Sequence, residues 1–146
     1  MEEGLSLLEE IRAQFDCQRP DVRTYSPLTL AFIGDCIYDL LVRTVVVERM
    51  QAPAHSLHKR KSEVVCATAQ AACATALLPE LTQEELAIYK RGRNAHSHTV
   101  AKNASVADYR KATGLEALYG FLYLTGRTDR LLALVKRSFE LTDISL

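Results

Sequence analysis

The sequence predicts an all-α fold, a single helical domain covering residues 1–146. Apolar residues recur at intervals of three and four over most of the chain, which is the spacing of one helix face. Helix-capping residues and prolines precede several of these stretches, and no segment has the convincing pattern of a strand. A chain of 146 residues is also long enough to bury a core without disulfides or structural metals.

Two helices are expected before residue 51. The first is short and amphipathic, and its apolar residues lie at helical spacing: Leu5, Leu8, Ile11 and Phe15. The second begins at Ser26, which can cap a helix with a proline in its first turn, and continues to about Met50. Because its residues are apolar on most faces, we expect this helix to be central and largely buried.

Two more helices are expected in the middle of the chain. Ser56 can cap a long helix that starts with basic residues and continues through small and aliphatic ones to Ala76. Pro79 then ends it. Thr82 and Glu85 have the spacing of a capping box, which predicts a short helix that ends near residue 92.

The last third of the chain is expected to hold a loop and two helices. Residues 92–105 have no clear periodicity and are typical of a loop. Helical spacing resumes at Ser105 and continues to about Leu124. Gly126 breaks the chain before a last helix that ends near Leu141.

Charge and cysteine content limit the class of protein. Lys and Arg together equal Asp and Glu at 18 each, so net charge gives no argument for a nucleic-acid partner. A local excess of basic residues nevertheless occurs between 90 and 111: Lys90, Arg91, Arg93, Lys102, Arg110 and Lys111. The four cysteines lack Cys-x-x-Cys spacing and are expected to be reduced and mostly buried. Charged residues interrupt every apolar stretch, so we expect no membrane contact and a cytoplasmic protein.

Two acidic residues stand in apolar surroundings close to a glycine. Asp35 follows Gly34 in the second predicted helix, and Glu116 precedes Gly120 in the helix that starts at Ser105. We expect Asp35 to point into or along the core. An ionised acid removed from water costs several kcal/mol unless a partner or a metal compensates it. The two acids therefore suggest a shared cation, held where two helix backbones approach closely at the glycines.

A structural explanation of these acids is also open. Asp39 and Arg43 are four residues apart on a helix, and an ion pair between them is the favoured interpretation of Asp39. In the same way, the two glycines could serve close helix packing alone, with Asp35 and Glu116 paired to arginines.

The residues around both acids resemble a known enzyme family. Phe32-Ile33-Gly34-Asp35 is similar to the signature helix of the ribonuclease III family, and Leu115-Glu116-Ala117-Leu118 with Gly120 is similar to its second acidic motif. Segments 91–95, 102–103 and 109–118 resemble the Mini-ribonuclease III branch of bacteria, which lacks a double-stranded-RNA-binding domain. The resemblance covers roughly residues 25–140.

This resemblance implies an all-helical endonuclease domain that works as a homodimer, with Phe32 at the interface. It implies that Asp35 and Glu116 are catalytic acids that bind Mg²⁺, with Mn²⁺ as a substitute. The implied substrate is double-stranded RNA, in this family the stem of precursor 23S (large-subunit) ribosomal RNA. Cleavage would leave 5′-phosphate and 3′-hydroxyl ends. A large-subunit ribosomal protein is a candidate further partner.

The resemblance also assigns RNA contact to the loop after residue 90, with four candidates: Arg91, Arg93, Lys102 and Asn103. Two acids of the full-length ribonuclease III pattern are missing, because Ala31 and Thr113 occupy their positions. Thr113 is a candidate to hold a metal-bound water. The alternative hypotheses are an inactive relative that binds RNA or a ribosome-assembly intermediate, and a helical scaffold dimer.

Overall fold

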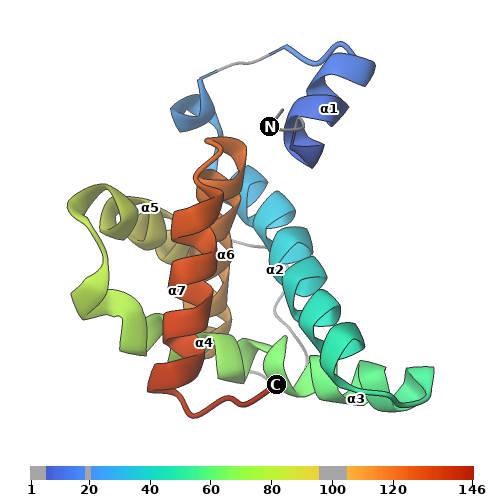
Figure 1. The fold of residues 1–146 in the computed structure, drawn as a ribbon. Helices are drawn as coiled ribbons and strands as arrows, with labels where there is room; N and C mark the ends of the chain where they lie inside the picture. The colour runs from blue at the N-terminus through green and yellow to red at the C-terminus, as the bar shows by residue number, and fades with distance from the viewer. Residues whose placement is uncertain (1–5, 19–20, 96–104) are drawn as a thin grey trace.

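The protein is described by a computed structural model that covers residues 6–18, 21–95 and 105–146 (Figure 1). These residues form α-helices, two short 3₁₀ helices and no strand, which confirms the predicted all-α class. In chain order the elements are α1 Leu7–Gln14, η1 Val22–Thr24, α2 Pro27–Arg49, α3 Ala54–Val64, α4 Ala67–Leu77, η2 Leu78–Glu80, α5 Gln83–Asn94, α6 Val106–Leu124 and α7 Thr128–Leu141.

Helix α6 lies at the centre of the fold. Figure 1 shows it between α2 on one side and α5 on the other, with α7 alongside. From Ala112 to Leu122 every residue of α6 except Glu116 is buried. A helix that is apolar on all sides is one that neighbours surround. The single half-buried acid in this stretch is therefore exceptional for its position.

Helix α2 starts as predicted but is buried on one face only. Ser26 caps it by accepting a hydrogen bond from the Thr29 amide at 3.1 Å. Its buried residues form one stripe: Leu30, Ala31, Gly34, Tyr38, Val42 and Val46. The opposite face exposes Phe32 and Leu40, so the expectation of a largely buried helix was wrong. Apolar composition alone did not distinguish the face against α6 from the open one.

The predicted long helix between residues 56 and 76 is broken into α3 and α4. Cys66 has an extended backbone, with φ −140° and ψ 159°, so the chain changes direction between α3 and α4. Ser56 is not the cap, because Pro53 holds that position and α3 begins at Ala54. No glycine or proline marks the break, so the sequence carries no local signal for it. The break turns α4 so that its small residues pack against α6.

Helix α5 has the predicted capping box but a different end. The Glu85 amide donates to Thr82 Oγ1 at 3.2 Å, and the Thr82 amide donates to Glu85 Oε1 at 3.0 Å. The helix continues through Gly92 to Asn94. A Cβ at Gly92 would lie 2.9 Å from the Gly114 Cα of α6. This glycine permits close packing and is not a stop signal.

The terminal helices agree with the prediction in outline. Helix α1 is capped by Ser6 and has no buried residue. Helix α6 begins after the cap residue Ser105, and Gly126, with φ +72°, leads into α7. Among the helices of the described ranges, none is long and apolar enough to cross a membrane. The expectation of mostly buried cysteines was wrong, because only Cys73 is buried and the other three are exposed.

Candidate active site

The crossing of α2 and α6 brings the two predicted acids together. A methyl group at Gly34 would overlap the carbonyl oxygen of Glu116, and one at Gly120 would overlap the carbonyl oxygen of Leu30. Each glycine thus receives the backbone of the other helix, which is the close approach expected from the sequence. Only residues without a Cβ allow two helices to approach this closely.

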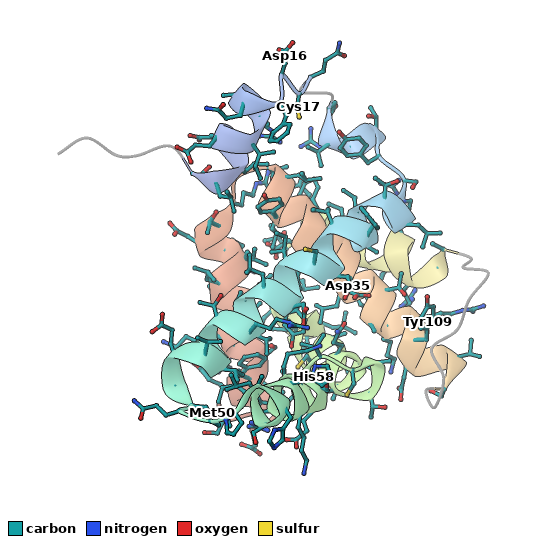
Figure 2. All side chains as sticks on the ribbon, turned by 90° about the vertical axis from the view of Figure 1, so that its right-hand side faces the viewer. Asp16, Cys17, Asp35, Met50, His58 and Tyr109 are labelled. Carbon is teal, nitrogen blue, oxygen red and sulfur yellow. The ribbon has the colours of Figure 1, made fainter. Side chains whose placement is uncertain are left out.

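Asp35 and Glu116 lie at different depths in this crossing. Asp35 is exposed, on α2 where that helix passes over α6 (Figure 2), so the expectation that it points into the core was wrong. Its neighbour Gly34 occupies the centre of the contact, and a helix turns by about 100° between neighbours. Asp35 is therefore at the rim. Glu116 is half-buried below it.

The two carboxyl groups interact directly and unfavourably when both are charged. Burial raises the pKa of Glu116 to about 9, and the hydrogen bond and charge of Asp35 raise this pKa in the same direction. Neither acid forms an ion pair with a basic side chain of the residues that the structure describes. The pair is therefore not explained as part of a structural salt bridge.

This donor set fits a divalent cation. Carboxylate oxygens are the ligands that Mg²⁺ and Mn²⁺ prefer, and a cation beside both groups would remove their mutual repulsion. Across the described ranges, no group of three or more His, Cys, Asp or Glu side chains is placed to hold a metal. A cation at Asp35 and Glu116 would therefore keep several waters, as Mg²⁺ commonly does.

The two positions without an acid are both buried. Ala31 is 8% exposed and packs in the core. Thr113 is 7% exposed, one turn before Glu116, and its hydroxyl donates to the Tyr109 carbonyl oxygen at 3.0 Å. Its hydroxyl hydrogen is thus used within α6. That Thr113 holds a metal-bound water stays a prediction.

Asp39 belongs to a separate, neutralised cluster. Arg43 Nε donates to Asp39 Oδ2 at 2.8 Å, which confirms the ion pair predicted from their spacing. Lys61 of α3 approaches Asp39 Oδ1 at 3.4 Å. The lysine was missed from the sequence because its approach depends on where α3 lies.

The candidate RNA-binding residues are only partly described. Arg91 is exposed on the last turn of α5. Arg93 Nε donates to Asn94 Oδ1 at 3.2 Å, and its guanidinium lies 5.8 Å from the centre of the Tyr89 ring. Lys102 and Asn103 lie outside the described residues. RNA contact by these side chains stays a prediction.

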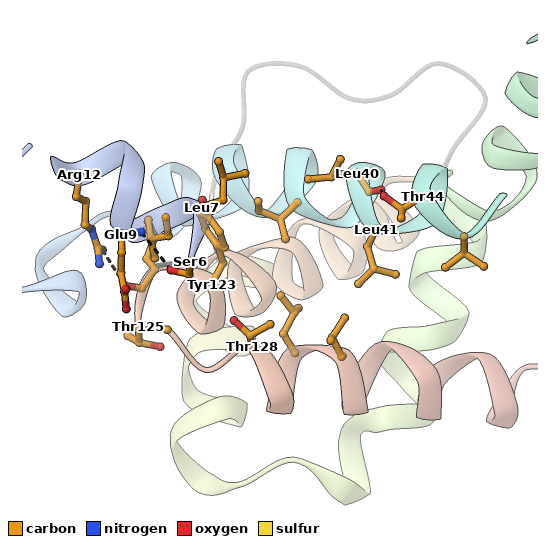
Figure 3. Close-up of a pocket in the computed structure, with 17 residues that line it drawn as sticks. Ser6, Leu7, Glu9, Arg12, Leu40, Leu41, Thr44, Tyr123, Thr125 and Thr128 are labelled. Carbon is orange, nitrogen blue, oxygen red and sulfur yellow. Dashed lines mark hydrogen bonds between the residues drawn. The ribbon is translucent and has the colours of Figure 1, made fainter. Parts of the chain in front are cut away.

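Phe32 lies on the open face of α2 and is 80% exposed. A separate, mostly apolar groove of about 710 Å³, whose lining does not include Phe32, runs between α1, α2, α7 and the end of α6 (Figure 3). Its lining includes Leu7, Leu40, Leu41 and Leu132.

Comparison with known proteins identifies the class that this fold and site define. The Ribonuclease III domain matches residues 28–127, so the chain belongs to the ribonuclease III family of endoribonucleases. The match contains both Asp35 and Glu116 and leaves α1 outside.

Within this family, the chain is similar to Mini-ribonuclease 3 proteins. The Mini-ribonuclease 3 of Brevibacillus brevis is 42% identical over 123 residues, which cover 84% of this chain and 92% of the relative. That of Enterococcus faecalis is 45% identical over 117 residues, covering 79% and 89%. A crystal structure of a protein from Fusobacterium nucleatum has a TM-score of 0.75 at 29% identity and covers 82% of this chain and 96% of its own. The family resemblance found in the sequence is confirmed.

Proposed function

We propose that this endoribonuclease depends on Mg²⁺, with Mn²⁺ as a substitute, and hydrolyses double-stranded RNA at Asp35 and Glu116. The observation that carries this proposal is the convergence of two carboxyl groups, without a basic partner among the described residues, at the crossing of α2 and α6. When bound, the metal activates a water for attack on phosphorus and stabilises the leaving 3′ oxygen. The products would carry 5′-phosphate and 3′-hydroxyl ends.

The two acids have different parts in this proposal. Half-buried Glu116 and exposed Asp35 would hold the cation together, with Asp35 on the side that an RNA phosphate can reach. The close glycine contact fixes both helices and hence the distance between the two carboxyl groups. Since only two carboxylates are available, water and substrate phosphate would supply the remaining ligands.

A cleavage assay on a plain RNA duplex tests this function. With Mg²⁺, the wild-type protein should cut the duplex, whereas Asp35→Asn and Glu116→Gln should lower the rate by at least about 10³-fold, as expected when a group that stabilises the transition state is removed. Asp39→Asn is the matched control, because its carboxylate is four residues away and already paired. Undiminished cutting by either active-site variant would contradict the assignment.

The proposed natural substrate is precursor 23S ribosomal RNA in the cytoplasm. The similarity to Mini-ribonuclease 3 proteins supports it, and a large-subunit ribosomal protein is a candidate to present the stem. Three exposed free thiols suit a reducing compartment. Incubating the purified protein with a precursor transcript, with and without ribosomal proteins, tests this substrate; cutting at random duplexes with no preference for the precursor would refute it.

The proposed RNA contact involves Arg91 and Arg93. Both lie in the last turn of α5, and charged side chains in such positions give salt-dependent binding to a duplex. Reversing both charges to Glu should weaken RNA binding about tenfold or more and flatten its dependence on salt. Electrophoretic or fluorescence binding at several salt concentrations measures this effect. Unchanged binding would exclude both arginines from the interface.

The proposed assembly is a homodimer formed through the open face of α2. Phe32 supports this assembly, because it is an aromatic side chain that protrudes from this face and is largely exposed. Phe32→Ala should weaken dimerisation by about 2–4 kcal/mol, as for a buried aromatic anchor. Sedimentation at low concentration measures it, with Val106→Ala, an exposed apolar residue of α6, as the control. An unchanged dimer would refute the role of Phe32.

A further inference from the structure

Arg91 is exposed on the last turn of α5 and forms no ion pair with an acidic side chain that the structure describes. Arginines on other surfaces of the described chain do pair with acids, as Arg23, Arg43 and Arg137 show. A guanidinium carries its N–H donors in one plane, and this geometry suits the paired oxygens of a phosphate. The donors of Arg91 are therefore available for a phosphate.

The packing of α5 places Arg91 at the level of the proposed metal site. Its neighbour Gly92 lies against α6, where a Cβ would be 2.8 Å from the Ala117 Cβ. Gly34 of α2 lies against the adjacent residue of α6, Glu116. One Cα step of about 3.8 Å separates Arg91 from Gly92. Helices α5 and α2 thus meet α6 at adjoining residues, and Arg91 is next to this meeting point.

The side of α5 that carries Arg91 is turned toward α2. Arg91 follows Glu84 by seven residues, close to two full turns, so both lie on one side of α5. Glu84 pairs at 3.0 Å with Arg23 of η1, the element directly before α2, and α5 also contacts α2 itself. In Figure 2, Asp35 and α5, the pale yellow helix, lie on the same side of α2. Arg91 and Asp35 therefore face each other from neighbouring helices.

Arg93 lies on the opposite side of α5 and is held there. Two residues along a helix correspond to a rotation of about 200°. The Arg93 guanidinium lies 5.8 Å from the centre of the Tyr89 ring, and its Nε donates to Asn94 Oδ1 at 3.2 Å. Tyr89 is in turn buried, with its ring 3.0 Å from the position of a Cβ at Gly114 of α6. The two arginines therefore differ both in direction and in freedom.

We propose that Arg91 is a further catalytic residue, whose guanidinium binds the RNA phosphate that is cleaved. This inference rests on the proposed function. In that hydrolysis a water oxygen bonds to phosphorus while the bond to the 3′ oxygen breaks, and the 3′ oxygen takes a proton from water. Negative charge develops on the phosphate oxygens, and Arg91 stabilises it without transferring a proton, because an arginine stays charged. Arg93 keeps its proposed part in binding the duplex away from this phosphate.

The cleavage rate at saturating RNA tests this role. With Mg²⁺, Arg91→Gln should lower the single-turnover rate about 10²-fold, as expected when a group that stabilises developing charge is removed. Arg91→Lys keeps the charge but not the planar donors, so it should lower the rate less. Measured with a chelator, the RNA affinity of Arg91→Gln should fall only about threefold, because one phosphate contact is lost.

Lys90 supplies a matched control. It is exposed, adjacent to Arg91, and two residues before Gly92, which faces α6, so it lies on the side of α5 away from α6. Lys90→Gln removes the same charge from the same turn and should cut at the wild-type rate. Thermal melts confirm that each variant is folded.

The possible outcomes separate this inference from the proposed function. If Asp35→Asn is inactive while Arg91→Gln cuts at the wild-type saturated rate, the inference alone is overturned, whether or not RNA affinity falls. An equal loss of rate in Lys90→Gln would also overturn it, since the effect would then be one of general charge. A wild-type protein that does not cut, or Asp35→Asn that cuts normally, would overturn the proposed function and this inference with it.

Discussion

Glu85 and Glu116 are two glutamates held away from water, and their surroundings are opposite. Glu85 is 3% exposed and receives two hydrogen bonds from Arg130, both at 2.8 Å, and one from the Thr82 amide. The guanidinium of Arg130 is the largest cause that lowers the pKa of Glu85. Glu116 instead lies beside another acid, and burial raises its pKa to about 9.

The different surroundings of Glu85 and Glu116 indicate different contributions to the stability of the fold. The Glu85 carboxylate joins the start of α5 to α7 and is compensated completely within the fold. No basic side chain among the described residues compensates the Glu116 carboxylate, so its charged form destabilises the metal-free fold. Strained or unfavourable groups of this kind concentrate at functional sites, where a ligand supplies what the fold omits. The comparison separates a structural acid from a candidate catalytic one.

The largest effect on stability is expected at Glu85. Glu85→Ala should lower the free energy of unfolding by about 3 kcal/mol, because it removes a buried carboxylate that pairs with Arg130 and closes the capping box of α5. Urea denaturation measures the loss. Glu84→Ala is the control, since Glu84 pairs with Arg23 and Arg127 at the surface and should cost at most about 1 kcal/mol. Similar losses of stability in Glu85→Ala and Glu84→Ala would show that Glu85 contributes no more than a surface ion pair.

A smaller effect of opposite sign is expected at Glu116. Glu116→Gln should raise the free energy of unfolding of the metal-free protein by about 1–2 kcal/mol at pH 8, although the proposed function predicts that it lowers the rate of cleavage. Thermal melts with a chelator measure this gain. Asp39→Asn, which removes a paired acid from α2, should give a small loss instead. A loss of stability in Glu116→Gln at pH 8 would mean that the carboxylate is compensated after all.

The pH dependence of this gain follows from the direction of the pKa shift. The pKa of Glu116 is about 9 in the fold and 4.5 without its environment, so between these values the fold must keep a proton that the unfolded chain has lost. The contribution of Glu116 to stability is therefore complete below pH 4.5 and declines as the pH rises toward 9. The advantage of Glu116→Gln should be smaller at pH 5 than at pH 8. An advantage that is equal at both pH values would contradict the shifted pKa.

Local signals in the sequence were reliable where one short segment contains the whole cause. The cap at Ser26, the capping box at Thr82 and the Asp39–Arg43 pair each depend on residues three or four apart, and all three are confirmed. The break at Cys66 and the continuation of α5 through Gly92 were missed. Both depend on packing against α6, which comes more than twenty residues later in the chain.

The sequence by itself determined the helical class, most helix starts, the two acids and the glycines beside them, since periodicity, capping and residue chemistry are local properties. Only the tertiary structure decided which side of α2 is buried, that Asp35 lies at the rim, and that Glu116 is held beside it with no basic side chain of the described residues as a partner. These features depend on how α2 and α6 cross, and no local pattern encodes that crossing.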